Sequence, residues 1–77
     1  MTKTELENEL AHIHNMHLEC YLSENNDYMP EEVRSRARAL KARLRTREQT
    51  VEGKLRDLVI AERVMRLDDI ERELGMQ

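Results

Sequence analysis

Residues 23–30 read "SENNDYMP", and they interrupt a chain whose other segments carry apolar residues at helical spacing. Ser, Asn and Asp side chains compete for nearby backbone groups, so they favour turns over helix interiors. Pro30 suits the first position of a helix, where its missing N–H leaves no hydrogen bond unmade. The stretch therefore predicts a loop at residues 23–29, with one helix before it and another starting at Pro30.

The segment before the loop is predicted to be a helix at about residues 4–22. Its apolar residues Leu6, Leu10 and Ile13 recur at helical spacing and share one face. Two capping boxes fit its start equally well, because Glu5 follows Thr2 by three residues and Glu7 follows Thr4 by three. The exact start of this helix is therefore open between them.

The segment after the loop is predicted to be one long helix at about residues 30–74. Its apolar seam is Val33, Leu40, Leu44, Val51, Leu55 and Leu58. A kink or break at residues 46–53 is the alternative, because Thr46 and Gln49 resemble a further capping box and Gly53 is a poor residue for a helix interior. An unbroken helix predicts an all-α helical hairpin, whereas a break predicts a monomeric three-helix bundle. Either form is a single small helical domain of residues 1–77.

The two predicted helices differ greatly in length. A helix from Pro30 to Leu74 would be about 67 Å long, and the first helix would span less than half of it. The first helix can therefore cover only part of the apolar seam on the long one. We expect a second copy to cover the rest, in a homodimeric helical bundle. The expected association seam is Leu6, Leu10, Ile13, Val33, Leu40, Leu44, Val51, Leu55 and Leu58.

Charge is distributed in blocks along the chain, whose formal net charge is −3. Residues 1–32 hold eight acids and one base, residues 33–47 hold seven bases and no acid, and residues 48–77 hold eight acids and five bases. The bases of the middle block are Arg34, Arg36, Arg38, Lys41, Arg43, Arg45 and Arg47. On a helical wheel they border the apolar stripe on both sides, as charged residues border a coiled-coil seam and select its partner.

Three roles are open for this basic block. It can pair with the acids of the first helix, face an acidic protein partner, or bind nucleic-acid phosphates. The first two are favoured, because residues 33–47 contain no aromatic residue and the chain lacks the basic isoelectric point that is typical of nucleic-acid-binding domains. A nucleic-acid-binding helical dimer that uses residues 33–47 is the alternative function.

Metal-capable side chains gather in "HIHNMHLEC", residues 12–20. On a helix, His14, His17 and Cys20 form one row, and His12 and Cys20 belong to another. Neither row has the spacing of a known zinc motif, and one helix offers fewer than the four ligands of a structural zinc site. No metal or cofactor is therefore expected, and these residues are weak candidates only.

Composition excludes further classes of protein. A single cysteine permits no disulfide within the chain, and "MTKTELENEL" has no apolar run that would suit a signal peptide. No motif for a phosphate loop or a nucleophile elbow is present, so we expect no enzyme. A cytoplasmic, non-membrane interaction module is expected: a small regulator, adaptor or inhibitor that binds another macromolecule through its helix faces.

Overall fold

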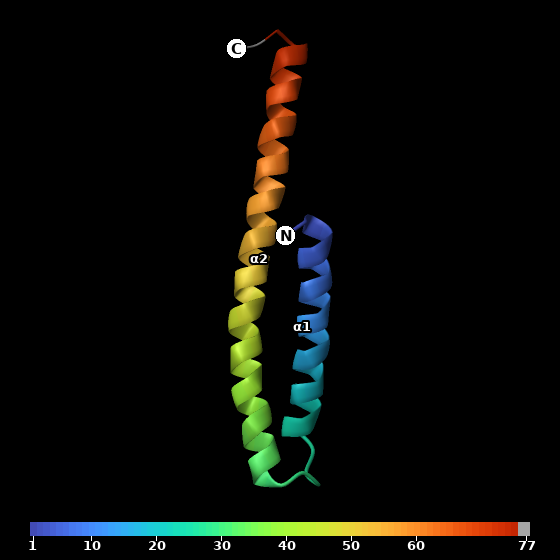
Figure 1. Cartoon of the computed structure of the whole chain (residues 1–77), viewed down its shortest axis with the longest axis vertical. Helices are drawn as coiled ribbons and strands as arrows, with labels where there is room; N and C mark the ends of the chain where they lie inside the picture. The colour runs from blue at the N-terminus through green and yellow to red at the C-terminus, as the bar shows by residue number, and fades with distance from the viewer. Residues whose placement is uncertain (76–77) are drawn as a thin grey trace.

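A computed structural model describes residues 1–75, and within them the chain forms two antiparallel helices and no strand (Figure 1). Helix α1 spans Lys3–Glu24 and helix α2 spans Glu31–Glu73. The molecule is a rod with principal dimensions of 67 × 18 × 15 Å. The expected all-α hairpin of a short helix packed on a long one is confirmed. None of the helices within residues 1–75 is both long and apolar enough to cross a membrane.

Helix α1 begins at the first of the two predicted capping sites. Thr2 has an extended backbone, and its hydroxyl oxygen accepts a 3.1 Å hydrogen bond from the N–H of Glu5. A threonine in this position satisfies one of the N–H groups that the first helical turn leaves without a partner. Thr4, the other candidate, lies inside the helix. The helix ends at Glu24, after which the side chain of Asn25 donates a hydrogen bond to the carbonyl of Tyr21.

The loop reverses the chain before α2 begins. The side chain of Asn26 accepts a 2.9 Å hydrogen bond from the N–H of Tyr28, which is the local pairing that makes asparagine a turn residue. The sequence predicted Pro30 as the first residue of the helix. Its ψ of 151° instead places it before the helix, as the cap. Its carbonyl accepts hydrogen bonds from the N–H groups of Val33 and Arg34, which fixes the first turn.

Helix α2 is uninterrupted through residues 46–53, so the third helix of the alternative fold does not form. Val51 and Leu55, on either side of Gly53, pack in the cluster between α1 and α2, and such packing can offset the low helix propensity of glycine. Thr46 and Thr50 bond back to the carbonyls of Ala42 and Thr46 within the same helix. Beyond residue 74 the chain leaves the helix at Gly75, whose φ of 73° lies in the left-handed region that favours glycine.

The core lies between the two helices and is narrow. Leu6, Ile13 and Val51 are almost wholly buried and contact one another as one cluster. Leu10, Met16, Leu44, Leu55 and Leu58 pack against this cluster, and Ala37 is buried nearer the loop. Burial of apolar area at roughly 25 cal/mol per Å² makes this strip the main source of stability for the hairpin.

The end of α2 projects beyond α1 (Figure 1). The last contact between the helices that involves charge joins Lys3 to Glu62 at 3.6 Å. Beyond Leu58 the apolar residues of α2 change sides. Ile60, Val64 and Leu67 lie on a face rotated by about 160–220° around the helix from Val51. Each of these three side chains is at least half exposed. The uncovered apolar stripe is therefore not a continuation of the seam that α1 covers.

Candidate functional site: an arginine-bordered groove

Four of the seven bases in residues 33–47 have partners within the chain, and three of these four bases join α2 to α1. Lys41 donates a 2.5 Å hydrogen bond to the carboxylate of Glu24, and Arg34 donates one of 3.0 Å to the carbonyl of the same residue. Arg38 pairs with Glu31 in the first turn of its own helix. Arg47 donates a 2.6 Å hydrogen bond to Glu9 of α1.

These pairs lower the pKa values of two carboxyl groups below the ordinary 4.5 for glutamate. For Glu24 the largest cause is the hydrogen bond from Lys41, which outweighs the opposite effect of desolvation on the pKa. For Glu31 the hydrogen bonds from Arg38 and Ser35 lower the pKa. Both carboxylates are held in their charged form because charged donors point at them.

The other three bases, Arg36, Arg43 and Arg45, make no ion pair with any residue in the described part of the chain, 1–75. They do not form one patch. Arg36 and Arg43 share one flank of α2 and are two turns apart, roughly 10 Å along the axis. Arg45 lies on the opposite flank. Of these three bases, Arg36 and Arg43 are therefore the two that present positive charge together.

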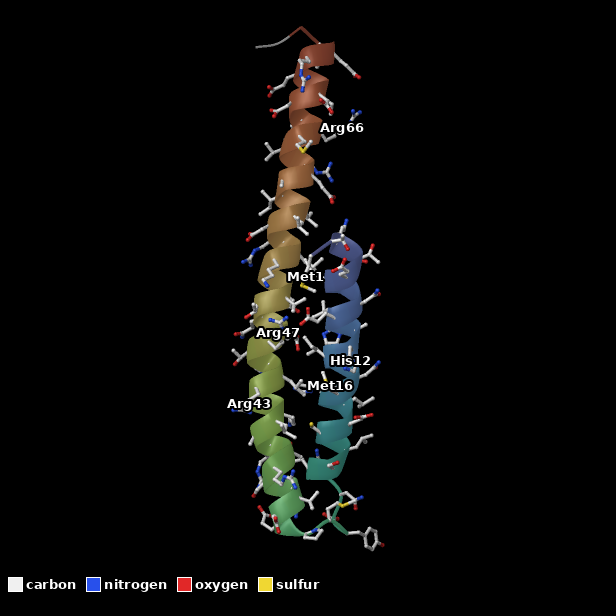
Figure 2. The ribbon with its side chains drawn as sticks, in the orientation of Figure 1. Met1, His12, Met16, Arg43, Arg47 and Arg66 are labelled. Atoms are coloured by element: carbon white, nitrogen blue, oxygen red, sulfur yellow. The ribbon has the colours of Figure 1, made fainter. Side chains whose placement is uncertain are left out.

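These two arginines border a groove between the helices. Its part nearest the loop is a hollow of about 270 Å³ that includes Val33, Arg36 and Leu40. A second hollow of about 440 Å³ continues along the hairpin past Arg43. Both hollows share Glu19, Cys20 and Leu40, so they join into one channel. Figure 2 shows Met16, part of the floor on α1, at the level of Arg43 on α2.

We name this channel the arginine-bordered groove, lined by Met16, Glu19, Cys20, Ser23, Val33, Arg36, Ala37, Leu40, Arg43, Leu44 and Arg47. Its floor is mainly apolar, with Leu40 47 % and Val33 37 % exposed. One rim carries Arg36 and Arg43, and the rim on α1 carries Glu19. An open apolar channel with charged rims can hold the apolar face of another helix.

The structure divides the predicted association seam into two groups. Leu6, Leu10, Ile13, Leu44, Val51, Leu55 and Leu58 meet in the interface between α1 and α2. Val33 and Leu40 stay accessible in the groove. Sequence periodicity cannot make this distinction. It shows which residues share a helix face, but not whether that face packs on a helix of the same chain or of another.

The predicted metal-capable row is not brought together as a ligand set. His12 is exposed, and His17 and Cys20 are half-buried along α1. His14 instead faces α2, with its Nε2 atom 3.6 Å from the carboxylate of Glu48. Glu52 joins them, so that one ligand atom from each of the three lies within 4.8 Å of the others. Sequence reasoning looked along a single helix and missed Glu48 and Glu52, whose spacing of four residues was the available signal.

Comparison with known proteins adds no family assignment. No protein-family model, curated protein or solved structure matches the chain.

Proposed function

We propose that the protein is a non-enzymatic interaction module that binds another protein in the arginine-bordered groove. The observation that carries this proposal is the position of Arg36 and Arg43. Both arginines lack an acidic partner within residues 1–75 and border the half-exposed side chain of Leu40. In the cell the module would act as a small regulator, adaptor or inhibitor.

The partner that fits this groove is an amphipathic helix with acidic residues along one edge. Its apolar face would cover Leu40, Val33 and Met16, and its acids would face Arg36 and Arg43. Exposed ion pairs add little affinity, about 0–1 kcal/mol each. Charge complementarity mainly selects the partner and its orientation, while the apolar contacts supply the affinity.

Direct binding of nucleic acid is the weaker candidate. Arg34, Arg38, Lys41 and Arg47 are already next to carboxylates or a carbonyl of the same chain, so phosphate would have to compete with these groups. Two unpaired arginines on one flank offer few phosphate contacts. Binding through few contacts would be weak and would depend only mildly on salt.

The proposal is tested by capture of partners from a cell extract with three forms of the protein. The first is the natural chain, and the second carries Arg36→Glu and Arg43→Glu on the groove rim. The third carries Arg45→Glu and Arg56→Glu, which change the total charge equally but lie on the opposite flank of α2. The extract is treated with nuclease, and bound proteins are quantified by mass spectrometry.

A protein that binds the natural chain and the control, and that is lost from the groove variant, supports the proposal. Equal capture by all three forms would show that the groove is not the binding surface. If all three forms capture proteins from untreated extract and none does so after nuclease treatment, the nucleic-acid alternative is favoured.

We also propose that the protein acts as a homodimer in the cytoplasm. The support for the dimer is the uncovered apolar stripe on the projecting end of α2, a feature that a second copy would bury. Light scattering coupled to size-exclusion chromatography tests it, since a dimer has twice the mass of the 9.2 kDa chain.

A further inference from the structure

The projecting end of α2 has a face whose residues are symmetric about Leu67. Seven side chains within residues 59–75 lie within about 60° of Leu67 around the helix. They are Ile60, Arg63, Val64, Leu67, Ile70, Glu71 and Leu74. We call this face the α2 end stripe. Ile60 and Leu74 lie seven residues on either side of Leu67, and Val64 and Ile70 lie three residues on either side.

The two charged residues of the α2 end stripe follow the same symmetry with opposite sign. Arg63 precedes Leu67 by four residues, and Glu71 follows it by four. Neither residue makes an ion pair within the described residues, 1–75. Arg72 does pair, with Asp69 at 3.0 Å, but both lie away from this face.

From this pattern we propose that two copies of the chain associate through their α2 end stripes in antiparallel orientation, with a two-fold axis at Leu67. The inference rests on the proposed homodimer and specifies its surface and its alignment. In this alignment Ile60 shares a layer with Leu74 of the second copy, and Val64 shares one with Ile70. Leu67 meets its own equivalent, so apolar residues face apolar residues in every one of these layers.

The charges decide between antiparallel and parallel alignment. Antiparallel pairing places Arg63 at the same level as Glu71 of the second copy, twice by symmetry. Parallel pairing places Arg63 beside Arg63 and Glu71 beside Glu71, and like charges at a partly buried interface are unfavourable. A parallel dimer would also bring the basic blocks of the two chains close together, whereas the antiparallel one directs the two hairpins apart.

The geometry of the hairpin leaves room for this arrangement. Helix α1 packs on the opposite face of α2, and its last charged contact is at Glu62. Figure 2 shows Arg66 on the part of α2 that extends past α1. The paired segment from Ile60 to Leu74 is roughly 21 Å long. An interface of one such helix pair is small, so the dimer is expected to dissociate on dilution.

Sedimentation equilibrium over a wide range of protein concentration tests the inference with variants of single charges. We expect Arg63→Glu alone and Glu71→Arg alone to weaken association by tenfold or more, and the double variant with both changes to restore it. Arg66→Glu, which lies about 100° away from Leu67 around the helix, is the control and is expected to leave association unchanged. Circular dichroism checks that each variant keeps its helix content.

Disulfide formation gives the orientation directly. In chains with Cys20→Ser, Ile60→Cys and Leu74→Cys are introduced separately and the two proteins are mixed and oxidised. Antiparallel pairing predicts the mixed disulfide between positions 60 and 74 as the main product. Disulfides of 60 with 60 and of 74 with 74 would show parallel pairing and overturn the inference.

The remaining outcomes separate this inference from the dimer itself. If the natural chain dimerises and the Leu67→Arg variant dimerises equally well, the proposed homodimer stands, but the α2 end stripe is not its interface. A natural chain that stays monomeric at all concentrations overturns both the homodimer and the inference.

Discussion

Lys41 of α2 donates a 2.5 Å hydrogen bond to Glu24, the last residue of α1, and the same ammonium group lies 5.6 Å from the centre of the Tyr21 ring. Arg34 donates a second hydrogen bond, of 3.0 Å, to the carbonyl of Glu24. The basic block thus begins by fastening the end of one helix to the start of the other. Bases that look like a phosphate-binding patch in the sequence therefore hold the two helices of the hairpin together.

The ion pairs of Glu24 and Glu31 predict how the stability of the fold depends on pH. The pKa of Glu24 is lowered in the folded chain, chiefly by the hydrogen bond from Lys41, and that of Glu31 is lowered chiefly by Arg38. A carboxyl group whose pKa is lower in the folded state stabilises the fold above its unfolded pKa. That stabilisation disappears as the pH falls through the folded pKa. Thermal unfolding should therefore occur at lower temperature as the pH is reduced from about 5 to 3.

Lys41→Met tests this origin of the pH dependence. The variant keeps the aliphatic stem and loses the charge, so the unfolding temperature should fall less steeply over the same pH range. Arg45→Met removes a charge that makes no ion pair within residues 1–75 and serves as the control. Identical pH profiles for the natural chain and Lys41→Met would show that this pair does not contribute.

The narrow core predicts a large effect at one position of α1. Ile13→Ala removes a side chain that is 1 % exposed and packed against Leu6 and Val51. The free energy of unfolding should fall by about 2–5 kcal/mol, which a small hairpin can barely tolerate. Leu22→Ala on the outer face of the same helix should change it by about 0.5 kcal/mol or less. Urea unfolding followed by circular dichroism measures both, and equal effects at the two positions would contradict the observed packing.

Gly53 is a site at which the natural chain can be stabilised. It lies in the interior of α2, and a Cβ atom there would meet only the guanidinium of Arg56, at 3.9 Å, an ordinary contact. Gly53→Ala should raise the free energy of unfolding by about 1 kcal/mol, because alanine is the better helix former. The reverse change in the same helix, Ala61→Gly, should lower it by a similar amount. No gain at Gly53 would mean that the helix requires glycine at this position.

The hairpin could be predicted from the sequence because its signals are local. The run from Ser23 to Pro30 marks the turn, and the apolar spacing on either side marks two helices. The choice between Thr2 and Thr4 as the cap could not be made, since both fit the same rule. Local helix propensity could not decide whether the helix continues through Gly53 either, because the packing of Val51 against α1 stabilises the helix there.

The groove could be predicted only in part. The helical wheel predicted bases on both sides of the apolar stripe, but it could not say which of these bases contact acids of α1. Arg47 and Glu9 are far apart in sequence, and only the hairpin register brings them together. That register leaves Arg36 and Arg43 without partners among residues 1–75. The spacing in the sequence shows that the apolar residues move to another face of the helix beyond Leu58. Only the structure shows that α1 ends near this point and leaves that face uncovered.

Photocrosslinking at Leu40 is the most direct test that the arginine-bordered groove binds a protein. A photoreactive amino acid replaces Leu40 in one form of the chain and Asn15, exposed on the outer face of α1, in a control form. After irradiation in cell extract, position 40 should form an adduct with an acid-edged amphipathic helix of another protein, and position 15 should not. Adducts with nucleic acid, or equal labelling from both positions, would contradict the proposed function.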